Sequence, residues 1–114
     1  MSGTGGGSGS GGYGADFDAS QASCEKLIIE TLLSSPKETV VDKLDVGDEL
    51  DVGLQRLGDT VTVNCSFEGQ VAGGIASREL LKLRECIESG TQYFAQVLEK
   101  SEGQVRVRIM AIRS

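Results

Sequence analysis

Three glycines precede a predicted helix in residues 69–90, GQVAGGIASRELLKLRECIESG, and glycine-rich loops at helix starts often hold phosphate groups. A Walker-type phosphate loop requires G-x-x-x-x-G-K-[ST], because the lysine and the hydroxyl complete the charge and metal contacts. Gly69 and Gly74 have this spacing, but Ile75 and Ala76 stand where the lysine and the hydroxyl residue belong. We interpret the glycine pair before Ile75 as a strand that bends closely past a neighbour. No cofactor is expected.

Side chains suited to catalysis are scarce. The chain has no histidine, which excludes Ser-His and Cys-His nucleophile systems and zinc sites with histidine ligands. Cys24, Cys65 and Cys86 lack the paired spacing of zinc or redox motifs, so we expect three reduced thiols. Cys65 and Cys86 fall on apolar faces, where a free cysteine packs as a small hydrophobe. We expect no metal site, no catalytic residue and no enzymatic activity.

Charge is distributed unevenly along the chain, whose net charge is -6. Residues 1–57 carry ten acidic and four basic side chains, whereas residues 58–114 carry seven of each. An acidic chain repels nucleic acid at long range, so DNA binding would need a local basic patch. The acidic residues around position 48 lack the spacing of a calcium loop. We expect instead that Asp45, Asp48 and Asp51 form a rim that meets a basic partner protein.

Composition divides the chain into two parts. Residues 1–22, rich in glycine and serine, are predicted to be a disordered tail, and residues 23–114 a single small β-barrel-like domain. No apolar run reaches the roughly 18–20 residues that span a bilayer. The N-terminal residues also lack the basic-then-apolar pattern of a secretory signal. We therefore expect a cytoplasmic protein without membrane contact, and the oligomeric state stays open.

Alternation of apolar and polar residues predicts most of the strands. Ser35, Pro36 and Glu38 form a capping box before a short helix at residues 36–44, and Ser77 caps an amphipathic helix at 78–89. The fold class predicted is α+β, with a small, strongly curved antiparallel sheet or barrel of about six strands. The amphipathic helix packs on this sheet. The strands are expected at residues 25–33, 48–56, 60–67, 70–76, 91–99 and 104–112.

The same alternation predicts which side chains face the core. The inward-facing residues expected are Leu50, Val52 and Leu54; Val61, Val63, Cys65 and Phe67; Val71, Gly73 and Ile75; Leu80, Leu83, Cys86 and Ile87; and Val105, Val107, Ile109 and Ala111.

Two stretches, VGDELDVGL at residues 46–54 and EGQVAGGIASRELLKLRECIESGTQYFAQV at 68–97, resemble the HIRAN domain. The shared features are a VGD entry to a strand, a glycine-containing strand before a glycine-closed helix, and a following strand with an aromatic residue. The resemblance implies a small β-barrel module, often attached to DNA-processing enzymes, that binds single-stranded DNA ends. The family's Asn-Pro and Asp signature is represented here only by Asp59.

Three functions follow in order of preference. The first is a non-enzymatic adaptor that binds another protein through an exposed sheet edge or the acidic rim. The second is a module for single-stranded DNA, with Arg106 and Arg108 on the outward face of an edge strand, Arg78 nearby, and Tyr93 as a stacking platform. For the two arginines, a solvated strand face is the competing interpretation. An enzyme of unknown class comes last.

Overall fold

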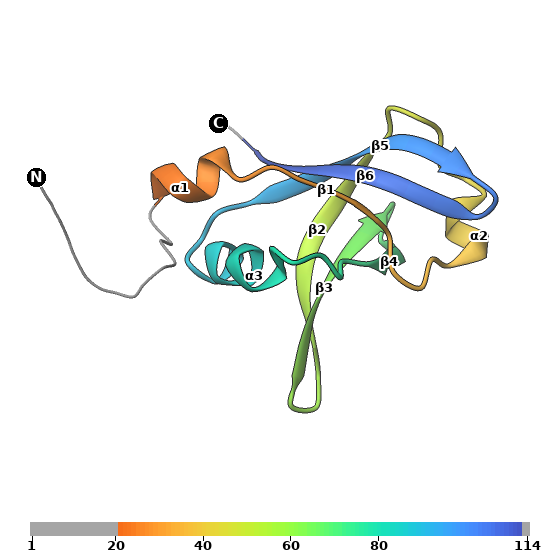
Figure 1. The fold of residues 1–114 in the computed structure, drawn as a ribbon. Coiled ribbons are helices and arrows are strands. Elements are labelled where there is room, and N and C mark those ends of the chain that lie inside the picture. Colours follow the sequence, from red (N-terminus) through yellow and green to blue (C-terminus); the bar gives the residue numbers. More distant parts are fainter. Residues whose placement is uncertain (1–20, 113–114) are drawn as a thin grey trace, which may run out of the picture.

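A six-stranded antiparallel sheet and three short helices make up residues 21–112, the part of the chain that the computed structural model describes (Figure 1). The spatial order of the strands is β1-β6-β5-β2-β3-β4. This arrangement confirms the predicted antiparallel α+β class. Residues 1–20 of the predicted tail lie outside the described residues. The elements are α1 (Gln21–Lys26), β1 (Ile29–Leu32), α2 (Glu38–Val41), β2 (Glu49–Leu57), β3 (Thr60–Phe67), β4 (Gln70–Gly74), α3 (Leu80–Glu88), β5 (Tyr93–Ser101) and β6 (Gln104–Ala111).

Tight two-residue turns join three of the strand pairs. Glu68 and Glu102 both adopt a φ of 52°, and each is followed by a glycine that also has a positive φ. Positive φ at both central residues is the pattern of a type I′ turn, whose twist matches that of the strands it joins. The third turn, at residues 58–59, also begins with a positive φ at its glycine. All three turns lie where the sequence predicts them.

The core lies on one face of the sheet and is filled largely by alternating side chains. Every second residue is buried in β6, as the sequence predicts, and in β5 from Tyr93 to Val97. Leu83 and Cys86 of α3 are fully buried, and the predicted stripe is completed by half-buried neighbours packed against them. Leu54 is predicted to face inward but is 37% exposed, because the β2–β3 hairpin extends beyond the rest of the sheet (Figure 1).

A register shift in the β3–β4 pair changes the predicted inner face of β4. The shift lies between Cys65 and Ser66, so that Ala72 has no direct partner in the register. Ala72 and Gly73 are both buried, while Val71 is only half-buried. The prediction that Val71 faces the core with Gly73 is therefore wrong, because an extra residue reverses the alternation.

The first predicted strand is shorter than expected. Residues 21–26 form α1, and β1 begins only at Ile29. The carbonyl of Cys24, inside α1, accepts a hydrogen bond of 2.6 Å from the Tyr93 hydroxyl. Long-range contacts of this kind override the β propensity of the local sequence.

Both predicted helix caps also differ from the structure. The residue before α2 is Lys37, which makes no side-chain cap, and Ser35 has a left-handed φ of 49°. Ser35 therefore turns the chain instead of starting a capping box. Ser77 accepts a 3.2 Å hydrogen bond from the Glu79 N–H, but α3 begins only at Leu80.

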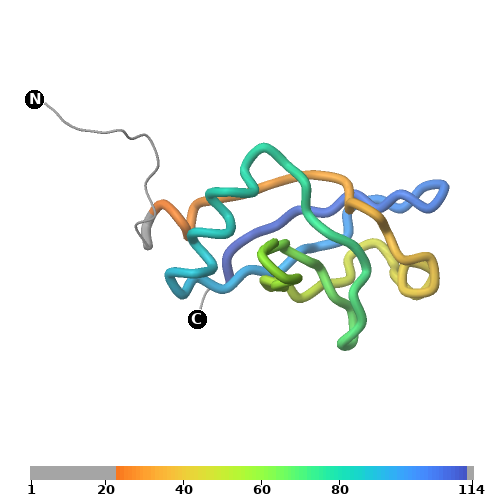
Figure 2. The backbone as a smooth tube through the Cα atoms, turned by 90° about the horizontal axis from the view of Figure 1, so that it is seen from below, coloured from red at the N-terminus to blue at the C-terminus, as the bar shows by residue number. Residues whose placement is uncertain are grey.

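Two of the three cysteines form a disulfide, and the third is a free thiol. Cys24 and Cys86 form a disulfide across a sequence separation of 62 residues, which holds α1 beside α3 (Figure 2). The prediction of three reduced thiols is therefore wrong for this pair, because residues this distant become neighbours only through the tertiary fold. Cys65 is free and buried, which confirms its predicted place in the core.

The edge strands β1 and β4 meet at a single point. Ser34, just after β1, and Gly74, the last residue of β4, exchange both backbone hydrogen bonds at 2.8 Å. The Lys37 N–H donates to the Ala72 carbonyl, also at 2.8 Å. Residues 34–37 thus cover the edge of β4, although the sheet as a whole stays open. None of the helices within residues 21–112 is long and apolar enough to cross a membrane.

Replacing Cys86 with alanine should lower the free energy of unfolding by about 2–4 kcal/mol, because the bond closes a long loop in the unfolded chain. Urea unfolding followed by circular dichroism measures the change. Thiol titration of the denatured wild type should give one thiol before reduction and three after it. Three thiols without reductant would contradict the disulfide.

Gly73→Ala should destabilise the fold by about 1–3 kcal/mol, because this is the typical cost of adding a methyl group where the surrounding atoms are already tightly packed. A Cβ at Gly73 would lie 3.0 Å from the Leu33 Cβ and 3.1 Å from the Ser34 carbonyl oxygen. Gly74→Ala is the matched control, since its nearest contact is the Asn64 Oδ1 at 3.4 Å. Equal melting temperatures for the two variants would contradict a tight approach at Gly73.

Candidate functional site

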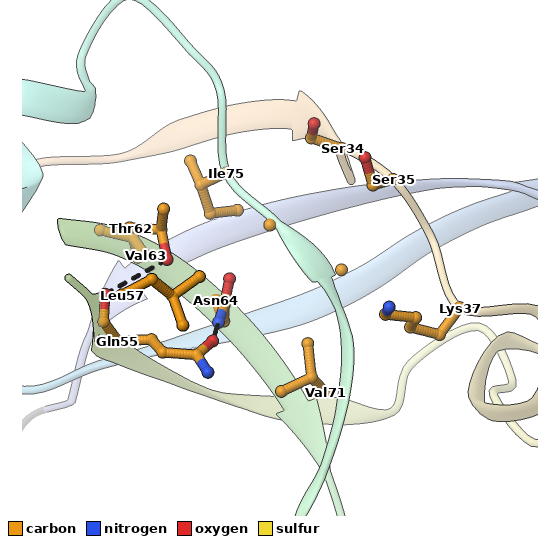
Figure 3. A pocket seen from close by; sticks show the side chains of 12 residues that line it. Ser34, Ser35, Lys37, Gln55, Leu57, Thr62, Val63, Asn64, Val71 and Ile75 are labelled. Atoms are coloured by element: carbon orange, nitrogen blue, oxygen red, sulfur yellow. Dashed lines mark hydrogen bonds between the residues drawn. The ribbon is translucent and has the colours of Figure 1, made fainter. Parts of the chain in front are cut away.

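Two adjoining hollows lie on the outer face of β2, β3 and β4, and we call them together the outer groove. The first has a volume of about 360 Å³ and is bounded by residues 34–37 on one side and the β2–β3 hairpin on the other (Figure 3). The second has a volume of about 290 Å³ and shares Gln55, Asn64 and Val71 with the first. The shared residues make the two hollows one continuous surface.

Strand alternation places the polar lining of the outer groove. Asp51 and Gln55 point away from the core on β2, opposite Ser66 and Thr62 of β3. Gly53 stands between Asp51 and Gln55, and no atom lies within 4 Å of the place where its Cβ would be. The missing side chain leaves open space in the middle of the row. The second hollow is therefore a direct consequence of a glycine at an outward position.

Amide and hydroxyl groups form a small network in the groove. The Asn64 side-chain amide donates to the Gln55 Oε1, and the Thr62 hydroxyl donates to the Gln55 backbone carbonyl at 3.3 Å. Figure 3 shows the Gln55 and Asn64 side chains meeting at the floor. These groups keep further donors and acceptors that a bound molecule can use.

Opposite charges mark the two hollows. Lys37 is the one charged residue among those that line the first hollow, and Asp51 the one that lines the second. The Lys37 side chain reaches toward the groove from the wall facing Asn64 (Figure 3). The lining is otherwise neutral, so the groove carries a cation in one half and an anion in the other.

The wall that carries Lys37 depends on an unusual backbone conformation at Ser35. Its φ of 49° lies in the left-handed region, which non-glycine residues enter at a cost of order 1 kcal/mol or more. The turn allows Ser34 to pair with Gly74 while Lys37 reaches the Ala72 carbonyl. Both contacts hold the wall in place.

Tyr93 does not offer a stacking surface to a nucleic-acid base. Its side chain is 3% exposed, and its hydroxyl donates to the Cys24 carbonyl. Burial also raises the pKa of the Tyr93 hydroxyl. The ring belongs to the core because position 93 is one of the inward positions of β5.

The arginines predicted for DNA are placed differently from expectation. Strand β6 lies between β1 and β5, so the prediction that Arg106 and Arg108 occupy an edge strand is wrong. Each guanidinium has a carboxylate neighbour: Arg108 pairs with Glu30 at 2.9 Å, and Arg106 lies 3.9 Å from Glu99. Arg78 is exposed in the turn before α3 and does not line the outer groove.

The predicted acidic rim divides into two parts. The Asp48 carboxylate accepts a 2.8 Å hydrogen bond from the Asp45 N–H, and the Asp48 N–H donates to the Asp45 carbonyl. These bonds close the turn that leads into β2, so Asp48 has a structural role. Asp51 instead lines the outer groove.

The groove residues Gln55 and Lys37 were not among the predicted site residues. Alternation in β2 and β3 does place Gln55, Thr62 and Asn64 outward, and this was the available signal. The position of Lys37 carries no comparable signal, because it depends on the contact between residues 34–37 and β4.

No cluster of three or more potential metal ligands occurs within the described part of the chain. No protein-family model, curated protein or solved structure matches this chain.

The Cys65 thiol should be unreactive in the folded protein, because burial raises its pKa from 9.0 to about 12. The unfolded state loses this proton first, so the stability that the neutral thiol contributes is complete below pH 9.0 and is lost as pH rises toward about 12. Raising the pH from about 7 to about 10 should therefore reduce the stability of the wild type more than that of Cys65→Val. Urea unfolding at both pH values measures this. Equal losses in the two proteins would contradict the raised pKa.

Proposed function

We propose that this domain is a non-enzymatic module that binds an extended segment of a partner protein in the outer groove. The observation that carries the proposal is the continuity of the two hollows through Gln55, Asn64 and Val71. Amide and hydroxyl groups beside an apolar surface suit a peptide backbone, which alternates polar main-chain groups with side chains.

The dimensions of the groove suit a short extended segment. Asp51 and Gln55 are four residues apart on one strand, a span of about 13 Å. A bound strand of about four residues covers the same distance. Its main-chain groups face the Gln55 and Asn64 amides, an acidic side chain approaches Lys37, and a basic side chain approaches Asp51.

Addition of a strand to the edge of β4 is a less favourable mode of binding. Residues 34–37 already use the carbonyl of Ala72 and both backbone groups of Gly74. A partner strand would have to displace these hydrogen bonds. We therefore place the partner on the outer face of the sheet rather than at this edge.

A second candidate function is binding of single-stranded DNA, as the resemblance to the HIRAN domain implies. The β-barrel that this resemblance implies is part of the same proposal. Arg106 and Arg108 share one outward face of β6, and their side chains stay 44% and 39% exposed. Phosphate groups would have to compete with Glu99 and Glu30 for them. Since the chain is acidic overall, we rank this function below peptide binding.

We further propose that the protein works in an oxidising compartment rather than in the cytoplasm. The Cys24–Cys86 disulfide supports this, because such bonds are rare where glutathione and thioredoxin keep thiols reduced.

Gly53→Leu should block the outer groove without unfolding the protein, because a side chain at this position enters open space. The probe is a peptide selected from a random library on the immobilised wild-type protein. Its affinity should fall at least about ten-fold in Gly53→Leu, the loss expected when about 1.4 kcal/mol of contact is removed. Thr60→Leu, at the exposed start of β3 and outside the groove, is the matched control.

Selected peptides that bind Gly53→Leu as well as wild type would refute the groove. A labelled single-stranded oligonucleotide tests the second candidate in the same assay. Binding of the oligonucleotide that is lost in Arg106→Ala with Arg108→Ala would favour DNA over a peptide.

A further inference from the structure

A separate apolar hollow lies on the outer face of the sheet where β1, β5 and β6 meet. Its volume is about 320 Å³, and it is lined by Glu25, Ile28, Phe94, Met110 and Ala111. We propose that this hollow, which we call the apolar pocket, binds an apolar side chain of a partner protein that is flanked by lysine or arginine.

The register of the sheet explains why apolar side chains gather there. Phe94 of β5 pairs with Met110 of β6, and both point away from the core. Ile28 directly precedes β1, whose first residue Ile29 pairs with Ile109, so Ile28 extends the same row beside Met110. One outward row thus runs across β2, β5 and β6, from Asp51 through Phe94 to Met110, and Ile28 continues it just before β1.

The fold leaves much of this row uncovered. Ile28 is 59% exposed, and Ile112, two residues beyond Met110, is 50% exposed. Large apolar side chains that gather at one exposed place indicate an interaction site more often than singly scattered ones do. Methionine and phenylalanine also suit such a site, because the thioether adapts its shape and both side chains contribute a large contact area.

The charges around the apolar pocket determine which residues are favoured on either side of the partner's apolar side chain. Glu25 lines the pocket, and Asp51 pairs with Phe94 at its other side. Glu49, paired with Gln96, adds a third carboxylate on the neighbouring row. The arginine of that row, Arg108, is already paired with Glu30. Basic residues on either side of an apolar anchor complement this field, whereas acidic residues are repelled.

The chain's own N-terminal residues do not fit this requirement. Residues 1–20 contain Tyr13 and Phe17 as apolar anchors, but no lysine or arginine. Phe17 stands between Asp16 and Asp18, which would face the carboxylates around the apolar pocket. Because the carboxylates of Asp16 and Asp18 and those around the pocket would repel each other, we favour a partner molecule over the chain's own N-terminal residues as the occupant.

Two short peptides of opposite charge test the proposal: Ac-Lys-Phe-Lys-amide and Ac-Glu-Phe-Glu-amide. The readout is the Met110 methyl signal in protein labelled with ¹³C-methyl methionine, identified by its loss in Met110→Leu. The lysine peptide should shift this signal saturably at millimolar concentration and bind at least about five-fold tighter than the glutamate peptide, because two exposed charge contacts differ. Ac-Lys-Ser-Lys-amide, without the apolar anchor, should leave the signal in place.

Ile28→Lys should abolish the shift, since it places a positive charge, which repels the lysine peptide, at the exposed rim of the apolar pocket. Leu81→Lys is the matched control, because Leu81 is similarly exposed at 61% but lies on α3 and does not line the pocket. Gly53→Leu should leave the shift intact, so failure of the outer groove and failure of the apolar pocket can be told apart.

Equal affinities for the lysine and glutamate peptides, or no shift up to about 10 mM peptide, would overturn the proposal. A Met110 shift that depends on protein concentration, together with sedimentation of a dimer that Ile28→Lys dissociates, would assign the pocket to a second copy instead. That result also overturns the proposal of a basic partner segment.

Discussion

The backbone pairing of Ser34 with Gly74 is the contact on which the rest of the domain depends. It brings the end of β1 against the end of β4, the two strands that lie at opposite edges of the sheet. The approach is close enough that a Cβ at Gly73 would collide with Leu33. Residues 34–37 then cover the β4 edge and raise one wall of the outer groove. The absence of a side chain at Gly73 thus permits the close approach that forms this wall.

Charged side chains in and around the sheet have at least three different physical roles. Asp48 and Lys100 serve the fold: Asp48 closes a turn, and the Lys100 ammonium donates to the carbonyls of Val41 and Leu44 at the end of α2. The arginines of β6 pair with carboxylates on the strand surface. Lys37 and Asp51 make no such pair within the described residues and line a hollow. This third group is the one suited to binding, because its charges are not used in internal pairs.

Asp51 connects the two surfaces that we propose for binding. It lines the second hollow of the outer groove and, through its pairing with Phe94, borders the apolar pocket. A partner chain that crosses the sheet at right angles to the strands would pass over both. The sheet therefore offers a polar and an apolar contact area on one continuous outer face, with the core closed on the other.

Local patterns in the sequence determined the strands, their hairpin turns and the buried stripe of α3. Period-two alternation and the Glu-Gly turns are properties of neighbouring residues, so they can be recognised without a fold. The register shift that buries Ala72 is not visible in this way, because it depends on how β3 and β4 pair.

Tertiary structure alone decided the strand order, and most of the candidate site followed from it. An internal β6 places Arg108 beside Glu30, and the register shift between Val97 and Glu99 turns Glu99 outward beside Arg106, although alternation along β5 would bury position 99. The Cys24–Cys86 bond and the burial of Tyr93 against Cys24 likewise need the helix at residues 21–26 to lie beside α3. The alternation of polar and apolar residues predicts which face of the sheet a side chain occupies. The residues that it contacts there depend on which distant strands pair through hydrogen bonds.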